Sequence, residues 1–259
     1  MNYKNIFSKL IEVFKQAGAL SLDLRLKGLK KEIKNDNTPV SNGDLEVNKI
    51  LINSIKKLTP HLPIVSEENS ANKDNRNLVN FWLIDPIDGT YDYVNNGDEF
   101  TLNAALIENK KAAAGIVYAP AKDRLFYTCG DGKSFEINQK KIIEICCEKK
   151  TKNNEIKAVS YSKVLKPEIQ NIYKLNNITE HVRMKSSLKF CVIAAGEYDG
   201  YVAEPRASEW DIAAGHAILK HSGGSITDFN GEEILYGKKG FKNPSLILKS
   251  KNILKWKNN

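Results

Sequence analysis

The segment Trp82-Leu83-Ile84-Asp85-Pro86-Ile87-Asp88-Gly89-Thr90 places two acidic residues, three positions apart, directly after an apolar run. Residues Phe81 to Ile84 predict a short buried strand that ends at Asp85. Pro86 fixes its own φ and favours an extended residue before it, so we expect the chain to turn sharply here and to bring Asp85 and Asp88 around one point. Because Asp-Pro and Asp-Gly are also ordinary turn formers, the segment alone leaves a purely structural turn open.

The chemistry of this segment suits a hard metal ion and an anion. Carboxylates of Asp85 and Asp88, with the Ile87 carbonyl between them, are oxygen ligands that favour Mg²⁺ over zinc, and no His or Cys ligand set lies nearby in the sequence. Gly89 lacks a side chain where an oxygen of a bound phosphate would approach. If a helix starts here, the amides of Gly89 and Thr90 face that anion.

Three further acids stand where predicted elements begin or end. Glu67 follows a predicted strand at Pro63–Val65, and Asp211 lies near the start of a predicted helix, Glu209–His221. Asp44 lies near the start of another helix. Each of these acids taken alone is also explained as a surface residue or as an acid that favours a helix N-terminus. Their combination with the segment above indicates a site.

Two amphipathic helices precede these acids. Apolar residues recur at spacings of three and four from Ile6 to Leu24 and again from Val47 to Leu58, which predicts one apolar stripe on each helix. A polar break at Lys34–Gly43 separates the two helices, and either Ser41 or Asn42 is expected to cap the second one.

After the second helix the period changes to that of strands, and the polar stretch Glu148–Glu155 divides two patterns. Before it we predict an antiparallel meander, with strands at Thr101–Ile107, Ala112–Tyr118, Arg124–Thr128, Lys133–Ile137 and Ile142–Cys146. After it strands and helices alternate, which favours an α/β layer. The predicted strands there are Ile156–Ser160, Glu180–Arg183, Tyr201–Ala203, Ser225–Thr227 and Ser245–Lys249, and the predicted helices start at Pro167, run from Ser187 to Ala195, and span Glu209–His221.

The positive charge of the chain comes mainly from lysine. The 39 Lys and Arg residues outnumber the 31 Asp and Glu residues and give a formal net charge of +8, yet only five of them are arginine. Sites that read nucleic-acid bases favour the planar fork of arginine, so we interpret the charge as a solvated lysine-rich surface. A non-catalytic nucleic-acid-binding protein is the alternative from another class, but no basic stripe interleaved with aromatic residues supports it.

The cysteines and the hydropathy pattern bear on the compartment. Cys129, Cys146, Cys147 and Cys191 form no C-x-x-C pair, so we expect free and mostly buried thiols in a reducing cytosol. The N-terminus has no long apolar region, and no apolar run reaches the roughly 18 residues of a membrane span. We expect a cytoplasmic protein, and leave open a peripheral location at the inner face of the membrane.

Three segments together resemble the inositol monophosphatase superfamily in order and spacing: Glu67-Glu68, Trp82 to Thr90, and Trp210-Asp211-Ile212-Ala213-Ala214-Gly215. The resemblance extends over nearly the whole chain. It implies an α+β and α/β fold, a five-layer α-β-α-β-α sandwich with the metals between two halves. An N-terminal α+β half, residues 1–150, would hold the antiparallel sheet and most metal ligands. A C-terminal α/β half, residues 151–259, would contribute Asp211 and the substrate contacts.

The resemblance also implies roles for the acidic residues. Glu67, Asp85, Asp88, Asp211 and the Ile87 carbonyl would bind two or three Mg²⁺ ions per active site. Thr90 and Asp44, assisted by Glu67, would polarise the attacking water, and the amides of Gly89 and Thr90 would hold the phosphate. Members of the superfamily hydrolyse phosphomonoesters and are typically inhibited by lithium.

Within the superfamily the chain looks most like the CysQ-type 3'(2'),5'-bisphosphate nucleotidases, which convert 3'-phosphoadenosine 5'-phosphate to AMP and phosphate. Stretches such as Lys34–Ser41, Glu99–Asn103 and Ser186–Cys191 are similar to those of this subgroup. The implied substrate-binding residues are Ser160, Lys163, Ser187 and Lys189.

The chain departs from the subgroup at residues expected to contact the substrate, not at the expected metal ligands. The subgroup often has S-R-S-H where this chain has Ser160-Tyr161-Ser162-Lys163, and a glycine commonly stands at the position of Lys185. An inositol monophosphatase or a related sugar-phosphate phosphatase with the same metals is therefore the alternative. The expected partner is a small phosphorylated molecule, not a nucleic-acid polymer. Because the superfamily contains monomers and dimers, a homodimer stays open.

Overall fold

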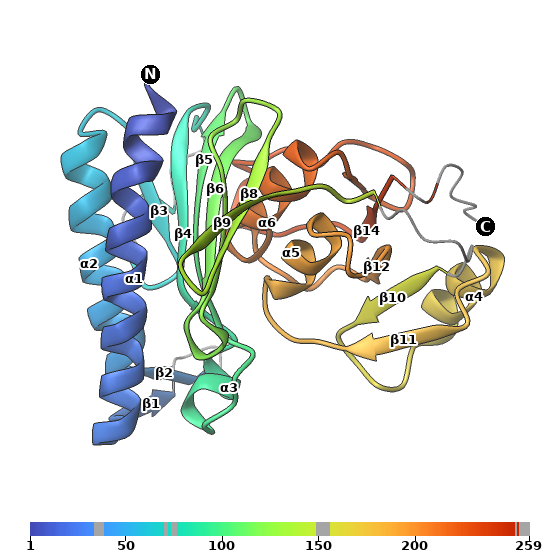
Figure 1. The fold of residues 1–259 in the computed structure, drawn as a ribbon, viewed down its shortest axis with the longest axis horizontal. Coiled ribbons are helices and arrows are strands. Elements are labelled where there is room, and N and C mark those ends of the chain that lie inside the picture. The colour runs from blue at the N-terminus through green and yellow to red at the C-terminus, as the bar shows by residue number, and fades with distance from the viewer. Residues whose placement is uncertain (34–38, 70–71, 74–76, 149–155, 252, 254–259) are drawn as a thin grey trace.

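Five layers of secondary structure make up the computed structural model, which describes residues 1–33, 39–69, 72–73, 77–148, 156–251 and 253 (Figure 1). The layers are, in order across the molecule, helices α1 (Tyr3–Lys27) and α2 (Asn42–Leu58), a seven-stranded sheet, helices α5 (Leu188–Ala194) and α6 (Glu209–His221), a five-stranded sheet, and helix α4 (Pro167–Leu175). The predicted α-β-α-β-α sandwich is confirmed.

The seven-stranded sheet is almost entirely antiparallel, and its strands follow chain order. The strands are β3 (Ile64–Ser66), β4 (Phe81–Asp88), β5 (Thr101–Glu108), β6 (Lys111–Ala119), β7 (Arg124–Thr128), β8 (Ser134–Asn138) and β9 (Lys141–Ile145). Only β3 and β4 pair in parallel. The short helix α3 (Thr90–Val94) and the 3-10 turn η1 (Pro120–Lys122) connect neighbouring strands. The predicted meander is therefore confirmed.

Strand β4 is longer than predicted, because it continues through Asp85 and Pro86 as far as Asp88 instead of turning sharply after Ile84. The register against β5 shifts between Asp85 and Asp88, so the irregularity is a bulge inside a strand. A bulge already interrupts the ladder, and it therefore tolerates a proline that has no N–H to donate. The expected sharp turn was wrong, and Gly89 makes the turn instead, at a φ of +89°.

The five-stranded sheet is mixed and is built from the second part of the chain. Its order is β11 (Glu180–Arg183), β10 (Lys157–Ser160), β12 (Gly200–Ala203), β14 (Leu246–Lys249) and β13 (Ser225–Thr227). Strand β10 is parallel to both of its neighbours, whereas β14 is antiparallel to β12 and β13. The 3-10 turn η2 (Lys239–Phe241) precedes β14. The predicted alternation of strands and helices matches this sheet closely.

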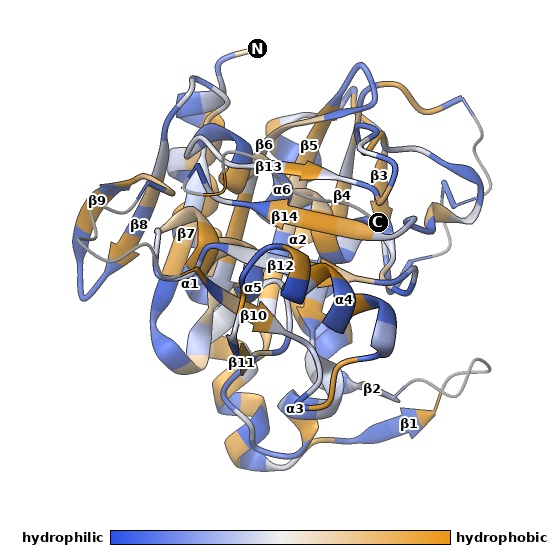
Figure 2. Ribbon diagram, turned by 90° about the vertical axis from the view of Figure 1, so that its right-hand side faces the viewer, coloured by the Kyte–Doolittle hydropathy of each residue, from blue (hydrophilic) through white to orange (hydrophobic). Residues whose placement is uncertain are grey.

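Two short paired strands lie in the polar break between the first two helices and were not predicted from the sequence. Strands β1 (Lys31–Ile33) and β2 (Pro39–Ser41) pair as a small antiparallel hairpin, which projects from the molecule in Figure 2. Ser41 then caps α2 in a capping box with Asp44, as one of the two expected caps. Residues 34–38 of the break, and 149–155 of the predicted linker, lie outside the described residues.

Two large apolar clusters hold the layers together. One lies between α1, α2 and the seven-stranded sheet, where the Phe7 and Trp82 rings pack at a tilt with centroids 6.0 Å apart. The other lies between the two sheets around α5 and α6 and includes the hydrophobic strand β14, orange in the middle of Figure 2. Because α6 packs against strands of both sheets, it joins the first and second parts of the chain.

The cysteines are free, as expected, and the histidines of α6 have hydrogen-bond partners. All four cysteines are free, and only Cys146 is exposed. His216 is buried against the Tyr236 hydroxyl, 2.8 Å away, and His221 accepts a hydrogen bond from the Gly132 amide. Among the described helices, none has the length and apolar character needed to cross a membrane.

Candidate active site

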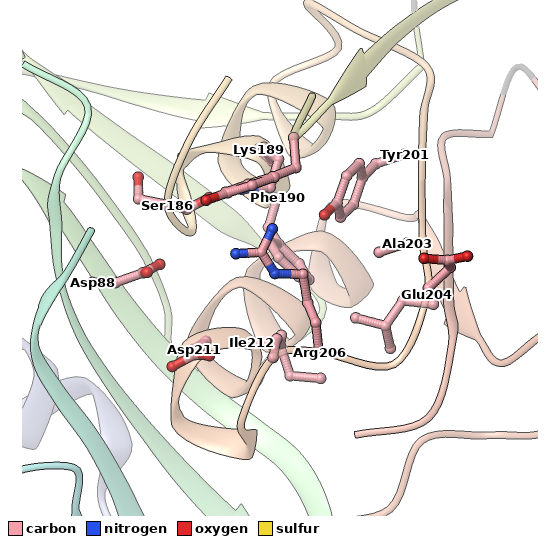
Figure 3. A pocket seen from close by; sticks show the side chains of 13 residues that line it. Asp88, Ser186, Lys189, Phe190, Tyr201, Ala203, Glu204, Arg206, Asp211 and Ile212 are labelled. Atoms are coloured by element: carbon pink, nitrogen blue, oxygen red, sulfur yellow. The ribbon is translucent and has the colours of Figure 1, made fainter. Parts of the chain in front are cut away.

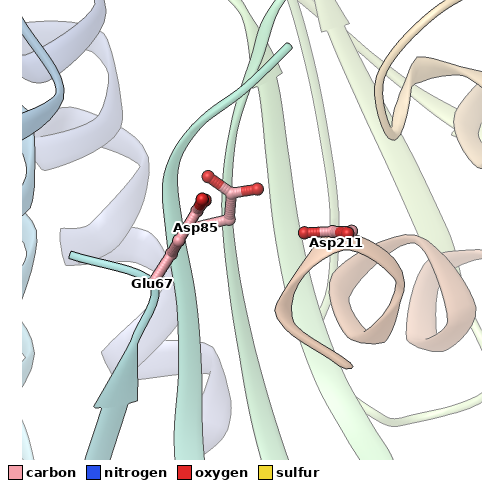
Figure 4. Close-up of side chains that lie close together, drawn as sticks. All are labelled: Glu67, Asp85 and Asp211. Carbon is pink, nitrogen blue, oxygen red and sulfur yellow. The ribbon is translucent and has the colours of Figure 1, made fainter. Parts of the chain in front are cut away.

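Three carboxylates converge between the two sheets. Glu67, Asp85 and Asp211 each offer one oxygen, and these oxygens all lie within 4.8 Å of one another (Figure 4). Glu67 follows β3, Asp85 belongs to β4, and Asp211 lies in the first turn of α6. The structure thus brings together residues that are far apart in the sequence.

Local backbone pairing explains how these side chains are placed. The parallel pairing of β3 with β4 continues to the Glu67 amide, which donates to the Ile84 carbonyl at 3.1 Å and sets Glu67 beside Asp85. At α6, the Ser208 amide donates to Asp211 Oδ2 at 2.7 Å in a capping box. Asp211 therefore both starts its helix and faces the other two acids.

The crowded, buried carboxyl groups of the cluster favour a bound cation. Burial and the charges of Glu67, Asp88 and Asp211 raise the pKa of Asp85 well above its ordinary value. Burial, Asp88 and Glu67 likewise raise the pKa of Asp211. Crowded carboxylates repel one another, and a bound divalent ion reverses that balance. The donor set consists of hard oxygens, so it fits Mg²⁺.

Strand β5 places further polar atoms beside the cluster. Thr101 and Asn103 lie opposite Asp88 and Asp85 in the register of β4 and β5. Thr101 Oγ1 and Asn103 Oδ1 are buried and have no hydrogen-bond partner among the described residues. Buried polar atoms are usually satisfied, so orphaned ones next to an acidic cluster indicate that water or an ion and its water shell belongs there.

Asp88 lies beside this cluster and is held by Ser187. The Ser187 hydroxyl is 2.8 Å from Asp88 Oδ2, contacts the Asp211 carbonyl and accepts a hydrogen bond from Asn103 Nδ2 at 2.9 Å. Burial raises the pKa of Asp88, while Lys189 and the bonds from Ser187 oppose that shift. Ser187 is thus part of the scaffold that positions the acids.

Thr90, Asp44 and Ile87 form a separate hydrogen-bonded group next to the acids. Thr90 Oγ1 lies 3.1 Å from Asp44 Oδ1 and 3.0 Å from the Ile87 carbonyl oxygen. Asp44 is buried, which raises its pKa, and its other oxygen accepts hydrogen bonds from the Ser41 amide and hydroxyl at 2.8 and 2.6 Å. Gly89 precedes Thr90 as the N-cap of α3.

Comparison with known proteins agrees with this arrangement. The sequence model of the inositol monophosphatase family matches residues 2–256. The chain belongs to the inositol monophosphatase family. It is therefore a metal-dependent phosphatase.

The similar proteins include bacterial nucleotidases. The chain is 32% identical to the 3'(2'),5'-bisphosphate nucleotidase CysQ of Salmonella typhimurium over 82% of this chain and 85% of that protein. It is 27% identical to the CysQ of Aggregatibacter actinomycetemcomitans over 94% of this chain and 92% of that protein. Among solved structures, CysQ from Bacteroides thetaiotaomicron aligns with a TM-score of 0.75 and 26% identity, covering 96% of this chain and 97% of that chain. The IMPase TM1415 of Thermotoga maritima aligns with a TM-score of 0.77 and 25% identity, covering 96% and 93%.

A cavity extends from Asp88 and Asp211 toward other residues of the second part of the chain. Asp88 and Asp211 line one end, and Lys189, Tyr201 and Arg206 line the other (Figure 3). Figure 3 shows the Arg206 guanidinium extending into the cavity. The side away from Asp88 and Asp211 thus carries two cations, together with Glu204, which pairs with Lys166.

Aromatic rings hold the two cations of this cavity. Arg206 Cζ stacks 3.5 Å from the centroid of the Tyr161 ring. Lys189 Nζ lies 5.8 Å from the same ring and 5.4 Å from that of Tyr201. Within the described part of the chain, neither cation forms an ion pair within 4 Å. Lys189 Nζ donates to the Ser186 carbonyl, and the charge of Asp88 acts on the ammonium group.

Two predicted substrate residues lie elsewhere. The Ser160 hydroxyl donates to the Ser162 carbonyl at 2.6 Å, and Ser160 lines an adjoining cavity, not the one with the acids. Lys163 lines a third hollow with His181, and its carbonyl oxygen is 3.2 Å from His181 Nε2. The structure therefore does not bring Ser160 or Lys163 together with the acids.

Tyr161 and Arg206 are the residues that sequence reasoning did not select. The expected substrate contacts in this part of the chain are Ser160 and Lys163, and Tyr161 lies between them in the sequence. The stack forms only because the end of β10 and the loop after β12 meet in space. A charge and a ring about 45 residues apart give no local pattern that would have found it.

Proposed function

We propose that this phosphatase is a Mg²⁺-dependent 3'(2'),5'-bisphosphate nucleotidase that converts 3'-phosphoadenosine 5'-phosphate to AMP and phosphate. The observation that carries the proposal is the cavity with an acidic cluster at one end and the cations Arg206 and Lys189 at the other. A bisphosphate can place one phosphate at each end, whereas inositol monophosphate has only one phosphate to place. The relatives named CysQ support the same assignment.

The oxygen ligands define where the metal would bind. Glu67, Asp85, Asp88, Asp211 and the Ile87 carbonyl would hold two or three Mg²⁺ ions, which fits the raised pKa values of Asp85 and Asp211. The Ile87 carbonyl oxygen lies 3.0 Å from Thr90 Oγ1, whose single proton can be donated to Asp44 instead, so the carbonyl keeps a lone pair for a metal. When bound, the metal lowers the pKa of water and neutralises charge on the phosphate.

The remaining residues would orient the attacking water, accept its proton and hold the phosphate. Thr90 donates to Asp44 and can in turn accept a hydrogen bond from the attacking water, so these two residues would orient that water. We assign removal of the water proton to the Thr90–Asp44 pair, assisted by Glu67. The amides of Gly89 and Thr90, which have no helical acceptor at the start of α3, would hold the phosphate. Hydrolysis would form a bond from the water oxygen to phosphorus while the phosphate–ribose P–O bond breaks, and the leaving ribose oxygen would take up a proton from solvent water.

An inositol monophosphatase, or a phosphatase of a related sugar phosphate, is the second candidate. It is favoured by the alignment with the Thermotoga maritima IMPase and by the position of Lys163, which lies away from the cavity. This enzyme would use the same acids and would leave Arg206 and Lys189 without a second phosphate.

Phosphate release distinguishes these candidates. 3'-Phosphoadenosine 5'-phosphate, inositol 1-phosphate and fructose 1,6-bisphosphate are each incubated with the full chain, with and without Mg²⁺. We expect Mg²⁺-dependent release that is fastest from the nucleotide. Faster release from inositol 1-phosphate would support the second candidate, and no turnover of any of the three would refute both.

A further inference from the structure

Lys185 connects the two parts of the chain at the edge of the active site. Its ammonium group forms an ion pair with Asp92 of α3, and its backbone amide donates to Glu99 Oε2 at 3.1 Å. The pair is largely protected from water, with side-chain exposures of 21% for Lys185 and 12% for Asp92. The connection before α5 is thus fastened to the loop that follows α3.

The loop at the other end of this contact is closed by several hydrogen bonds. Asp92 Oδ2 accepts from the Glu99 amide at 2.9 Å, and the Gly97 amide donates to the Asp92 carbonyl at 2.8 Å. Arg25 of α1 donates to the Gly97 carbonyl at 2.6 Å. A Cβ at Gly97 would lie 2.1 Å from Asp92 Oδ2, so the turn closes tightly around this carboxylate.

The two residues after Lys185 need such support. Ser186 has a φ of +53°, a left-handed conformation that is unfavourable for a serine and persists only where its surroundings impose it. Its carbonyl accepts from Lys189 Nζ. Ser187 follows and holds the Asp88 carboxylate at 2.8 Å. The position of Ser187 therefore depends on how the chain is held at Lys185.

We propose that Lys185 is a positioning residue, which uses its ion pair with Asp92 to hold Ser186 and Ser187 in place and thereby orients Asp88 and Lys189, which both line the cavity. The proposal rests on the proposed function of that cavity. It assigns a use to the lysine that stands where a glycine is common in the subgroup. It also makes the Asp92 loop, which contributes no predicted ligand, part of the active-site framework.

A double-mutant cycle tests this role. Lys185→Met, Asp92→Asn and the double variant are compared with wild type in kcat, in the Mg²⁺ concentration for half-maximal activity, in Mg²⁺ affinity by calorimetry, and in thermal midpoint. Removing a direct hydrogen-bond partner of a metal ligand typically costs about 10- to 100-fold in affinity or activity. Lys185 acts on Asp88 through Ser187, so we expect Lys185→Met to lose kcat or Mg²⁺ affinity at the lower end of that range, about 10-fold. The double variant should lose no more kcat or Mg²⁺ affinity than the worse single variant, because the two substitutions remove the same Lys185–Asp92 contact.

Two further variants separate positioning from general stability. Lys185→Arg keeps the charge and should keep most of the activity, while Lys133→Met removes the exposed Lys133–Glu144 pair, far from the cavity, and should change nothing. Wild-type kcat and Mg²⁺ affinity in a folded Lys185→Met would overturn the proposal, as would additive losses in the cycle. If wild type itself releases no phosphate, the proposed function fails, and calorimetry still reports whether Lys185 supports Mg²⁺ binding.

Discussion

Lys189 is a buried cation whose charge depends on pH in a useful range. Burial lowers its pKa to about 8, although Asp88 works against the shift. The ammonium is therefore charged below pH 8 and becomes neutral above it. If Lys189 attracts the second phosphate, KM for the bisphosphate rises as the pH increases through 8. KM measured against pH for wild type and Lys189→Met checks this, because the variant should show a high KM without that rise. An equal rise in both proteins would contradict the role.

Tyr161 acts on the substrate through Arg206. A cation–π contact contributes about 0.5 to 2 kcal/mol, so we expect Tyr161→Ala to raise KM for the bisphosphate by a few-fold up to about 30-fold. Tyr161→Phe keeps the ring and serves as the matched control. KM for a monophosphate should be similar in all three proteins. A uniform change for both substrates would show that the stack does not select the second phosphate.

Among single residues, the sequence predicted the acids better than the cations. Glu67, Asp85 and Asp211 belong to short segments with recognisable spacing, and the structure brings them within 4.8 Å. Tyr161, Arg206 and Lys185 meet their partners only through the tertiary fold, so no local spacing reveals them. Their roles, like those of the acids, stay proposals until they are measured.

At the scale of elements, the contact between β6 and α6 sets the separation of the central layers. A Cβ at Gly115 would lie 2.7 Å from the Ala214 carbonyl oxygen and 2.9 Å from its Cα. Backbone atoms cannot rotate away, so Gly115→Ala should lower the free energy of unfolding by about 1 to 3 kcal/mol, the usual effect of overpacking. Urea denaturation measures the change. An unaltered midpoint would mean that α6 shifts freely on the sheet.

Most elements followed from periodicity, and the exceptions have physical reasons. The helices α1, α2 and α6 carry long amphipathic or apolar patterns that local sequence shows clearly. The hairpin of β1 and β2 is short and polar, and β1 is exposed throughout, so no burial pattern marks it. Strand β4 continues past Pro86 because pairing with β5 outweighs the local preference for a turn.

At the scale of the whole molecule, the division into halves 1–150 and 151–259 stays a proposal. One apolar cluster contains residues of both halves, among them Phe81 and Ile218, and α6 of the second half covers the sheet of the first. We therefore expect neither half to fold alone and the two, produced together, to assemble. Circular dichroism of each half and of the mixture tests this. A cooperatively unfolding, isolated first half would contradict it.

The central claim is that the buried carboxylates bind the divalent metal that drives phosphate release. Its most direct test is phosphate release from 3'-phosphoadenosine 5'-phosphate as a function of Mg²⁺ concentration, in wild type and in Asp85→Asn. We predict turnover in wild type only with Mg²⁺ and a loss on the order of 100-fold or more in the variant. Without metal, the variant should have the higher thermal midpoint, because it lacks one buried repelling charge. Turnover without Mg²⁺, or near-normal turnover in Asp85→Asn, would contradict the account.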